Sequence, residues 1–386
     1  MAGVREMDVA RRRRPRDRKQ QILSVATELF VQLGYQAVTM RLIADRVGIQ
    51  AGALYRHFAN KAVLFEAVVR ESYVDFTPTT DTATSLTETL AANCAAAVPR
   101  RHLLALWSRE ARHLPKETQR AVRALLRRST QGYIDLIRAE RPEVSAGQAE
   151  MLALATQSVL ASPGLFSVRL PADDLAAVLF AACTAVCAVD LAATGEREVP
   201  VESPLRPVSR RERLLLAAMR LFAQNGYQEA TMADIGAAAD VTGPNLYAYF
   251  ENKADVLIAV VERGKNALWL DLGAALAAHS RPPDALEAVV AGTVRLSRNW
   301  SSLQAPAIGV PGVESVVKDM WRDYIAEWTG LLRASRPDLD PQRARVLVHA
   351  GLTVLDDLAR TPHLTSDAAF DQNVALMVLA ILYAAT

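Results

Sequence analysis

The chain contains an internal repeat, and this repeat restricts its fold more than any other feature of its 386 residues. Residues 30–61 return as residues 222–253 at an offset of 192 without a gap, and 13 of these 32 positions are identical. Twice the offset is 384, nearly the full length, so two tandem copies of one unit of roughly 190 residues account for the chain. Farther along, residues 141–143 (Arg-Pro-Glu) and 336–338 (Arg-Pro-Asp) correspond at an offset of 195, which indicates a small insertion in the second copy.

The stretch between the copies, residues 194–209, contains three prolines and is predicted to be a linker. We therefore call residues 1–193 copy 1 and residues 210–386 copy 2. The composition is typical of globular units, because 51% of the residues are hydrophobic and the mean hydropathy is +0.08. The 44 basic and 42 acidic residues leave a net charge of +2, so any surface for nucleic acid must be local.

The cellular compartment is predicted from two patterns. Three cysteines cannot form the disulfide framework of a small secreted scaffold, and no apolar segment follows the basic residues near the N-terminus as in a secretory signal. The longest uncharged stretches are also shorter than the roughly 18–20 apolar residues that cross a bilayer. We therefore expect a cytoplasmic protein without a membrane segment.

Each copy opens with the pattern of an amphipathic helix. Apolar residues recur at i, i+3, i+4, i+7 and i+8 from Ile22 in copy 1 and from Leu214 in copy 2. Gly34 and Gly226 are predicted to end this helix, because glycine readily adopts the positive φ that often follows a helix C-terminus.

Three further helices are predicted in each copy. A tight turn at Gly48 or Asp240 separates a second short helix from a third one, expected over residues 51–58 and 243–250. Three short helices joined in this way form a helix-turn-helix, and a long fourth helix follows. The polar N-caps of the second and fourth helices are predicted at Thr39, Thr231, Asn60 and Asn252.

At these residues the chain resembles the TetR family of bacterial regulators. The family signature combines Phe-x-x-x-Gly-Tyr, Thr-x-x-x-Ile-Ala and Leu-Tyr-x-His/Tyr-Phe-x-x-Lys at fixed spacing, and the resemblance covers residues 18–70 and 210–262. It implies an all-α fold in which three helices bind DNA, a middle group surrounds an effector pocket, and a final helix pair dimerises. A tandem fusion departs from the usual homodimer of the family. The expected domains are two helix-turn-helix domains (1–65 with a basic arm, and 210–257) and two helical regulatory domains (66–193 and 258–386) around the linker.

The surface that would read DNA bases is predicted near the start of the third helix, because recognition helices contact base edges with their N-terminal residues. In copy 1 the buried pair Leu54 and Phe58 leaves an outward face on which Arg56 is the best candidate to bind guanine, although a phosphate contact is an alternative. In copy 2, Asn245 could read adenine. The other residues of the two faces are Gln50, Ala51 and Ala53 in copy 1, and Thr242, Gly243, Ala248 and Tyr249 in copy 2.

The phosphate contacts are implied by the family resemblance and by hydroxyl or lysine chemistry at helix ends. For the tyrosines the alternative is ordinary helix packing, whereas Lys61 and Lys253 are taken as needed for phosphate and not for packing. The expected phosphate-binding residues are Thr39, Tyr55, His57 and Lys61 in copy 1, and Thr231, Tyr247, Tyr249 and Lys253 in copy 2.

The positive charge is unequally divided between the two domains. Residues 1–61 contain twelve Lys or Arg and five acids, a net charge of +7, whereas residues 204–253 contain six and five, a net charge of +1. Copy 1 is therefore expected to neutralise most phosphates. The basic run from Arg11 to Lys19 is either an arm that reaches into a minor groove or a solvated tail.

The effector pocket is predicted among the middle helices, and the effector is expected to be small and largely apolar. An aromatic helix face in copy 2 is interpreted either as the pocket wall or as core packing, with a loop around Gly309, Pro311 and Gly312 beside it. The candidate pocket residues are Trp107 and Phe166 in copy 1, and Trp300, Trp321, Tyr324 and Trp328 in copy 2.

The last two helices of each copy, within residues 146–193 and 340–385, are predicted to form a four-helix bundle inside one chain. This would make the family dimer a covalent pseudo-dimer on a non-palindromic operator, while pairing between chains is the alternative. Cys94, Cys183 and Cys187 are interpreted as small buried residues or, alternatively, as a thiol or metal sensor.

No catalytic, nucleotide-binding or metal-binding motif occurs in the sequence, so we expect neither an enzyme, nor a cofactor, nor a metal site. The sequence predicts a ligand-responsive transcriptional repressor whose partners are double-stranded DNA and a small effector. The alternative is an all-helical association or ligand-binding protein whose helix-turn-helix copies no longer bind DNA.

Overall fold

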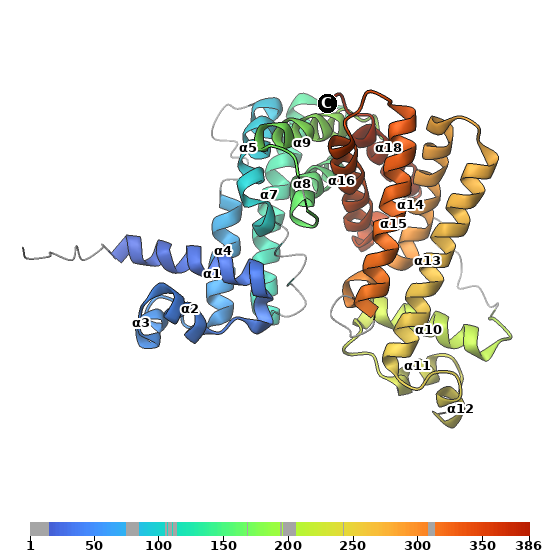
Figure 1. Ribbon diagram of the computed structural model, residues 1–386, viewed down its shortest axis with the longest axis horizontal. Coiled ribbons are helices and arrows are strands. Elements are labelled where there is room, and N and C mark those ends of the chain that lie inside the picture. Colours follow the sequence, from blue (N-terminus) through green and yellow to red (C-terminus); the bar gives the residue numbers. More distant parts are fainter. Residues whose placement is uncertain are drawn as a thin grey trace, which may run out of the picture. The chain divides into compact units, whose positions relative to one another are not determined.

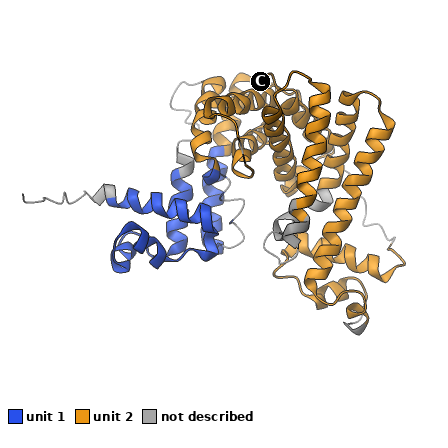
Figure 2. Ribbon diagram, viewed as in Figure 1, with its two compact units in different colours: residues 1–77, 102–129 blue, residues 78–101, 130–386 orange. Residues whose placement is uncertain are grey.

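The computed structural model describes residues 15–74, 85–104, 106, 110, 114–167, 169–193, 195, 206–241, 243–307 and 313–386 (Figure 1). Within these residues the regular structure is helical throughout, which confirms the predicted all-α class. The chain divides into two compact units (Figure 2): residues 1–77 and 102–129 form unit 1, and residues 78–101 and 130–386 form unit 2. Unit 2 therefore contains the later helices of copy 1 together with all of copy 2. None of the described helices is both long and apolar enough to cross a membrane.

Unit 1 contains the first helix-turn-helix. Helices α1 (Pro15–Ala37), α2 (Met40–Val47) and α3 (Ala51–Tyr55) are followed by α4 (Lys61–Val74), and α1 packs against both α2 and α4. Parts of α5 (Leu86–Leu104) and α7 (Lys116–Glu140) belong to the same unit. An aromatic cluster closes the core, with ring centroids 5.2 Å apart for Phe30 and Phe65 and 5.3 Å apart for Tyr35 and Phe65.

Unit 2 contains the second helix-turn-helix. Helices α10 (Arg210–Asn225), α11 (Met232–Ala238), α12 (Gly243–Tyr247) and α13 (Lys253–Ala278) repeat the order of the first four helices. A core of Leu, Val and Ala with Phe222 and Phe250 holds them together.

The predicted turns and caps are confirmed in both copies. Gly34 and Gly226 have φ of 77° and 81°, and the second turn has φ of 75° at Gly48 and 55° at Asp240. Gly34 lies within the bounds given for α1 but has a non-helical backbone, so the long part of this helix ends there and a kink separates it from residues 35–37. Each of the four predicted N-caps accepts a hydrogen bond from a backbone N–H three residues later, at 2.9–3.1 Å, in Thr39, Thr231, Asn60 and Asn252.

The third helices are shorter than predicted, because they end at Tyr55 and Tyr247. Phe58 and Phe250 are nevertheless buried, since a hydrogen-bonded turn continues past each helix end, with Phe58 N donating to Leu54 O at 3.0 Å. The burial of Phe58 and Phe250, from which longer helices were predicted, is thus produced by the turn that follows each helix.

The regulatory helices of both copies lie in unit 2. Copy 1 contributes α8 (Ala146–Ala161), the short η2 (Ser162–Gly164) and α9 (Ala172–Cys187). Copy 2 contributes α14 (Pro282–Ala307), α15 (Val313–Ser335), α16 (Pro341–Ala359), α17 (Pro362–Thr365) and α18 (Phe370–Leu382). Helices α8 and α9 pack against each other, α8 packs against α16, and α9 packs against α18.

The repeat extends to this last helix pair, although the sequence similarity has faded there. Arg141 donates to the carbonyl of Cys187 at the end of α9 at 2.7 Å, and Arg336 donates to the carbonyl of Leu382 at the end of α18 at 2.8 Å. Both arginines and both carbonyls are related by the same offset of 195. Helices α8 and α9 are therefore the structural counterparts of α16 and α18.

The three cysteines are buried in unit 2, as one of the two interpretations expected. Burial raises the pKa of Cys187 to about 11 and holds the pKa of Cys183 well above its usual range. A protonated, inaccessible thiol is a poor nucleophile and a poor metal ligand.

Candidate DNA-binding surfaces and effector pocket

The predicted reading face of copy 1 lies on the outside of its helix-turn-helix. Gln50, Ala51 and Arg56 are exposed and Ala53 is half-buried, while Leu54 is completely buried. These side chains form a surface that a DNA groove could approach, and Arg56, directly after α3, is the cation among the predicted reading residues. An exposed guanidinium at this place can bind a guanine edge or a phosphate.

The corresponding face of copy 2 has a different chemistry. Asn245 and Ala248 are exposed at the positions equivalent to Ala53 and Arg56. Copy 2 therefore presents an amide at the position of Ala53 and a methyl group in place of the guanidinium. Thr242 lies outside the described residues, and only the backbone of Gly243 is described.

The tyrosines beside the reading faces do not pack in the core. Tyr55 is 52% exposed, Tyr247 58% and Tyr249 42%, and His57 is exposed as well. These fractions argue against the packing alternative, because a core tyrosine would be buried. Their rings and hydroxyls remain available to a phosphate backbone.

The two N-cap threonines differ in the hydrogen bonds of their hydroxyl groups. Thr39 Oγ1 accepts from Leu42 N at 3.1 Å, whereas Thr231 Oγ1 also donates to Asp234 Oδ2 at 2.6 Å in a capping box. The carboxylate at the start of α11 repels phosphate from a helix end that would otherwise attract it. Copy 2 is therefore less suited to phosphate binding here than copy 1.

Lys61 and Lys253 have a packing role, which the sequence argument had denied. Lys61 Nζ donates to Tyr35 O at 2.7 Å and Gln36 O at 3.3 Å, and lies 4.3 Å from the centroid of the Tyr35 ring. Each lysine thus ties the start of the fourth helix to the corner after the first helix, where the carbonyls at a helix end lack intrahelical partners.

The same clamp is more complete in copy 2. Lys253 Nζ donates to Tyr227 O at 2.7 Å, Gln228 O at 3.2 Å and Ala230 O at 3.0 Å, and lies 4.4 Å from the Tyr227 ring centroid. An ammonium has three protons, so all three are used in copy 2, whereas the two carbonyls in copy 1 leave one proton of Lys61 for a phosphate.

Sequence reasoning missed one acid at this corner. Glu110 is 7% exposed, and its Oε2 accepts from Tyr35 N at 3.0 Å. This N–H follows Gly34, whose non-helical backbone leaves it without an intrahelical acceptor. A single glutamate in a segment without a motif carries no signal that could have revealed the contact.

The basic run at the N-terminus is described only in part. Residues 1–14 lie outside the described part, as do the side chains of residues 15–17. Lys19 is exposed, with its Nζ 5.8 Å from the centroid of the Phe58 ring. The interpretation of this run as an arm stays a prediction.

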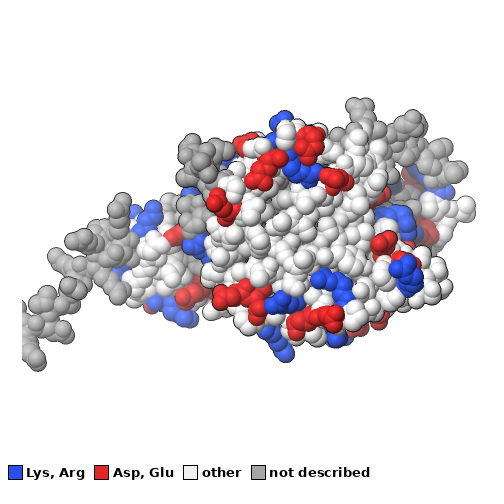
Figure 3. Space-filling model, turned by 90° about the horizontal axis from the view of Figure 1, so that it is seen from above, with Lys and Arg blue, Asp and Glu red and all other residues white. Residues whose placement is uncertain are grey.

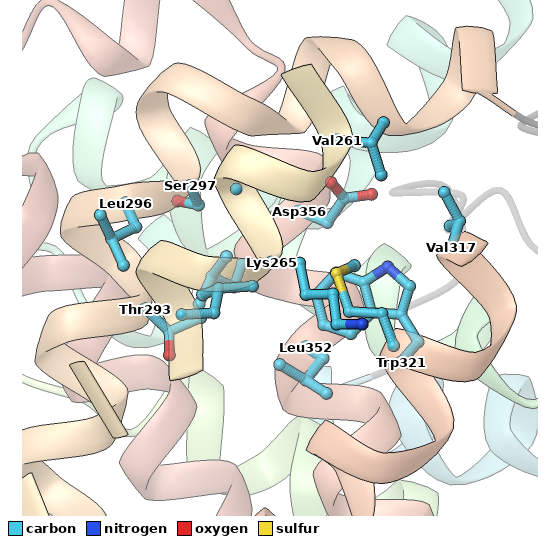
Figure 4. A pocket seen from close by; sticks show the side chains of 13 residues that line it. Val261, Lys265, Thr293, Leu296, Ser297, Val317, Trp321, Leu352 and Asp356 are labelled. Atoms are coloured by element: carbon cyan, nitrogen blue, oxygen red, sulfur yellow. The ribbon is translucent and has the colours of Figure 1, made fainter. Parts of the chain in front are cut away.

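A pocket opens among four helices of copy 2 (Figure 4). Its wall is mostly aliphatic, with Trp321 as its aromatic member and Lys265 and Asp356 as its charged members. The lining residues are Val261, Gly264, Lys265 and Leu268 of α13, Thr293, Leu296 and Ser297 of α14, Val317, Met320 and Trp321 of α15, and Leu352, Leu355 and Asp356 of α16.

The predicted aromatic residues divide between pocket and core. Trp321 lines the pocket, whereas Tyr324 and Trp328 are completely buried, and the Tyr324 hydroxyl is 2.7 Å from Thr293 Oγ1. Phe166 of copy 1 instead stacks on His349 of α16, with ring centroids 3.6 Å apart. Trp107, the Trp300 side chain and the predicted loop at Gly309, Pro311 and Gly312 lie outside the described residues.

Asp356 is the buried charged group of this pocket. Its Oδ2 is 3.0 Å from Arg360 Nη2, while its buried Oδ1 has no hydrogen-bond partner among the residues that the structure describes. Burial raises the pKa of this carboxyl to about 6, against the opposing effect of Arg360. Neither Asp356 nor Lys265 was predicted, because isolated charges on a helix form no motif.

The fold and these surfaces define a helical protein with two helix-turn-helix domains in tandem. The family model for "Bacterial regulatory proteins, tetR family" matches residues 22–68 and 214–260, which are the corresponding parts of the two copies. The chain therefore carries the DNA-binding domain of the TetR family twice.

Curated relatives resemble the chain over short stretches. The transcriptional activator FasR of Mycolicibacterium smegmatis is 48% identical over 59 residues, which is 15% of this chain and 27% of the relative. The repressor KstR2 of the same organism is 38% identical over 81 residues, 20% of this chain and 39% of the relative. The repressor AcnR of Corynebacterium glutamicum is 37% identical over 65 residues, 17% and 35%. The matches thus span between about a quarter and two-fifths of these relatives.

Solved structures resemble about half of the chain. The ketosteroid regulator KstR2 of Mycobacterium tuberculosis matches with a TM-score of 0.39 and 17% identity, over 46% of this chain and 95% of that one. The fatty acid degradation regulator FadR of Bacillus halodurans gives the same TM-score and identity over 46% and 97%.

Proposed function

We propose that the chain is a sequence-specific transcriptional regulator that joins two different DNA-reading domains in one polypeptide as a pseudo-dimer. It acts as a repressor, and a small, largely apolar effector releases it from DNA. The observation that carries this proposal is the packing of α8 and α9 of copy 1 against α16 and α18 of copy 2 within unit 2. The resemblance to the TetR family implies that such a final helix pair is the dimerisation surface.

Specific polar contacts support the pairing of the copies. Arg343 Nη2 lies 2.7 Å from Asp174 Oδ1, and Ser158 Oγ donates to Asp357 Oδ2 at 2.8 Å. Asn373 is completely buried, accepts from Ala192 N at 2.7 Å and donates to Ala192 O at 3.2 Å. The chain just before the linker is therefore bound to α18, and tethering further favours an intramolecular pairing through its high effective concentration.

The operator is expected to be non-palindromic. A twofold axis that relates identical recognition helices selects an inverted repeat, but here Arg56 is joined to a domain with Asn245 and Ala248 on its reading face. No symmetry requires the two half-sites to match.

Sedimentation of the complex with a short operator taken from the DNA upstream of the coding sequence tests the assembly. One chain per operator is the expected result. Two chains on a perfect inverted repeat would contradict the pseudo-dimer and favour pairing between chains. A second chain would have a surface on which to pack, because Figure 3 shows a broad area without charged side chains on the face seen from above.

Arg56→Ala tests the reading assignment. If Arg56 reads a base, the variant should lose discrimination at one base position by about 1–3 kcal/mol and bind other sequences nearly as before. Equal weakening on every sequence would make Arg56 a phosphate contact. Arg120, exposed on α7 of the same unit and outside the helix-turn-helix, provides a control substitution. Failure of the wild type to bind any DNA at low salt would instead favour the association protein with degenerate helix-turn-helix domains.

A further inference from the structure

The charged groups at the copy 2 pocket are two carboxylates and one guanidinium, so they do not form a single neutral ion pair. Arg360 Nη2 lies 3.0 Å from Asp356 Oδ2 and 2.6 Å from Asp357 Oδ1, so one guanidinium serves two carboxylates. When both carboxylates are ionised, this cluster of three side chains keeps one negative charge. Asp356 is the member that lines the pocket.

The carboxylate also has an unused acceptor. Asp356 Oδ1 is buried and without a hydrogen bond from any described residue, a state that is unfavourable for a buried polar atom. A donor on a bound molecule would remove this cost. Apart from Lys265 and the hydroxyls of Thr293 and Ser297, which donate to the backbone carbonyls of Val289 and Val294, the wall is mostly aliphatic, with Trp321 as its aromatic member. The bound molecule must therefore also be apolar over most of its surface.

Lys265 is the other charged residue on the wall, and it could in principle select an anion instead. Its side chain is half-buried, and a lysine can line an apolar wall with its carbon chain while it turns the ammonium to water. Asp356 has a short side chain that is held by Arg360, so its carboxylate cannot leave the pocket in the same way. The carboxylate is therefore the stronger determinant of the ligand.

The acidic cluster belongs to copy 2 alone. At the offset of 195 that relates α8 to α16, the positions of Asp356, Asp357 and Arg360 are occupied in copy 1 by Ala161, Ser162 and Leu165. The helix pair of copy 1 thus forms without these charges, so the charge of Asp356 is not required by the helix pair itself.

We propose that the copy 2 pocket binds an amphipathic cation. Its apolar body packs between α13, α14 and α15 against Leu268, Met320 and Trp321, and its protonated amine donates to the carboxylate of Asp356 (Figure 4). This assignment deepens the proposed function and rests on it, because it names the chemical class of the effector.

The same cluster connects the pocket to copy 1. Asp357, which shares Arg360 with Asp356, accepts a hydrogen bond at 2.8 Å from Ser158 on α8. An amine at Asp356 competes with Arg360 for one carboxylate and leaves the guanidinium more strongly with Asp357. Ligand binding in copy 2 is thereby coupled to the helix pairing between the copies.

Calorimetric titration of the full chain without DNA tests the ligand class. Three probes share one eight-carbon chain and differ in the head group: octylamine, octanoate and octanol. Octylamine should bind the wild type more tightly than octanoate and octanol, and Asp356→Asn should weaken octylamine at least about tenfold, as expected for a lost charge-assisted hydrogen bond. Lys265→Met should bind octylamine at least as tightly as the wild type.

Two further measurements keep the result interpretable. Leu268→Trp fills the pocket but leaves the ion pairs unchanged, so it should also weaken octylamine binding at least about tenfold. This result can be read even if Asp356→Asn folds poorly. Tighter binding of octanoate that is lost in Lys265→Met would overturn the proposal, as would equal binding of octanol or no binding of octylamine. Since these titrations contain no DNA, their failure is distinct from a failure of the chain to bind an operator.

Discussion

The two helix-turn-helix domains share their internal scaffold and differ on the surface that faces DNA. In both, a threonine caps the second helix, a positive-φ glycine ends the first, and a lysine clamps the corner between them. The outer positions equivalent to Ala53 and Arg56 are instead Asn245 and Ala248. Duplication has thus kept the residues that fold the domain and changed those that would read a sequence, which separates the two roles within one chain.

The scaffold itself differs at the corner after the first helix. In copy 1, Glu110 lies against this corner, and a Cβ on Gly34 would come within 3.2 Å of its carboxylate. In copy 2, a Cβ on Gly226 would meet no described residue within 4 Å. The corner of copy 1 is therefore closed by an acid, whereas no residue in the described part of the chain closes that of copy 2.

The largest expected effect distinguishes these two corners. Gly34→Ala and Gly226→Ala both force a side chain into a positive-φ conformation, which costs about 1–3 kcal/mol. Only Gly34→Ala also pushes against Glu110 and weakens its bond to Tyr35 N, for roughly 1–3 kcal/mol more. Urea unfolding should show the greater loss for Gly34→Ala. Equal losses would mean that Glu110 moves aside without cost.

A smaller effect, on the pH dependence of stability, is expected from a position at which the paired helices α8 and α16 differ. His349 of α16 stacks on Phe166 of copy 1, and burial, aided by the charge of Arg345, lowers the pKa of His349 to about 3. The equivalent residue of copy 1 is Leu154. Because the folded-state pKa lies below the ordinary value near 6.5, the unfolded chain binds the proton first as pH falls. The stability is complete above pH 6.5 and is lost progressively toward pH 3.

The variant His349→Leu, which introduces the copy 1 residue, isolates this titration. Between pH 7 and pH 5 the wild type should lose about 2 kcal/mol of unfolding free energy relative to His349→Leu, since pH 5 is 1.5 units below the unfolded pKa. Thermal unfolding at both pH values measures the difference. The comparison with the variant cancels the other groups, including Asp356, whose raised pKa acts in the opposite direction. Parallel pH profiles for both proteins would show that His349 is charged in the folded state.

The scaffold of each helix-turn-helix could be predicted from sequence, because its signals are local. Caps at Thr39 and Thr231 and turns at Gly34 and Gly226 act over a few residues, and a repeat shows each of them twice. The last residue of the third helix could not be predicted, since the spacing of Leu54 and Phe58 is the same in a longer helix and in the turn that buries Phe58 in the structure.

The pocket could be predicted only in its neighbourhood. Trp321 lines it while Tyr324 and Trp328 fill the core, because core and pocket walls use the same apolar residue types at the same helical spacing. Asp356 becomes part of the pocket only because α16 packs beside residues of α13, α14 and α15. No pattern in the sequence near Asp356 indicates this packing.

The smallest expected effect concerns the two clamp lysines. Lys61→Met and Lys253→Met both remove the clamp, so both should lower the unfolding midpoint of their own domain. Lys61 has one proton left after two carbonyl bonds, and copy 1 carries the net charge of +7 over residues 1–61, so we expect Lys61 alone to contact a phosphate. Operator affinity measured over a range of salt concentrations should give a slope shallower by about one unit for Lys61→Met and an unchanged slope for Lys253→Met. A change in both slopes would mean that Lys253 exchanges a carbonyl for a phosphate on DNA, and a change in neither would make both lysines purely structural.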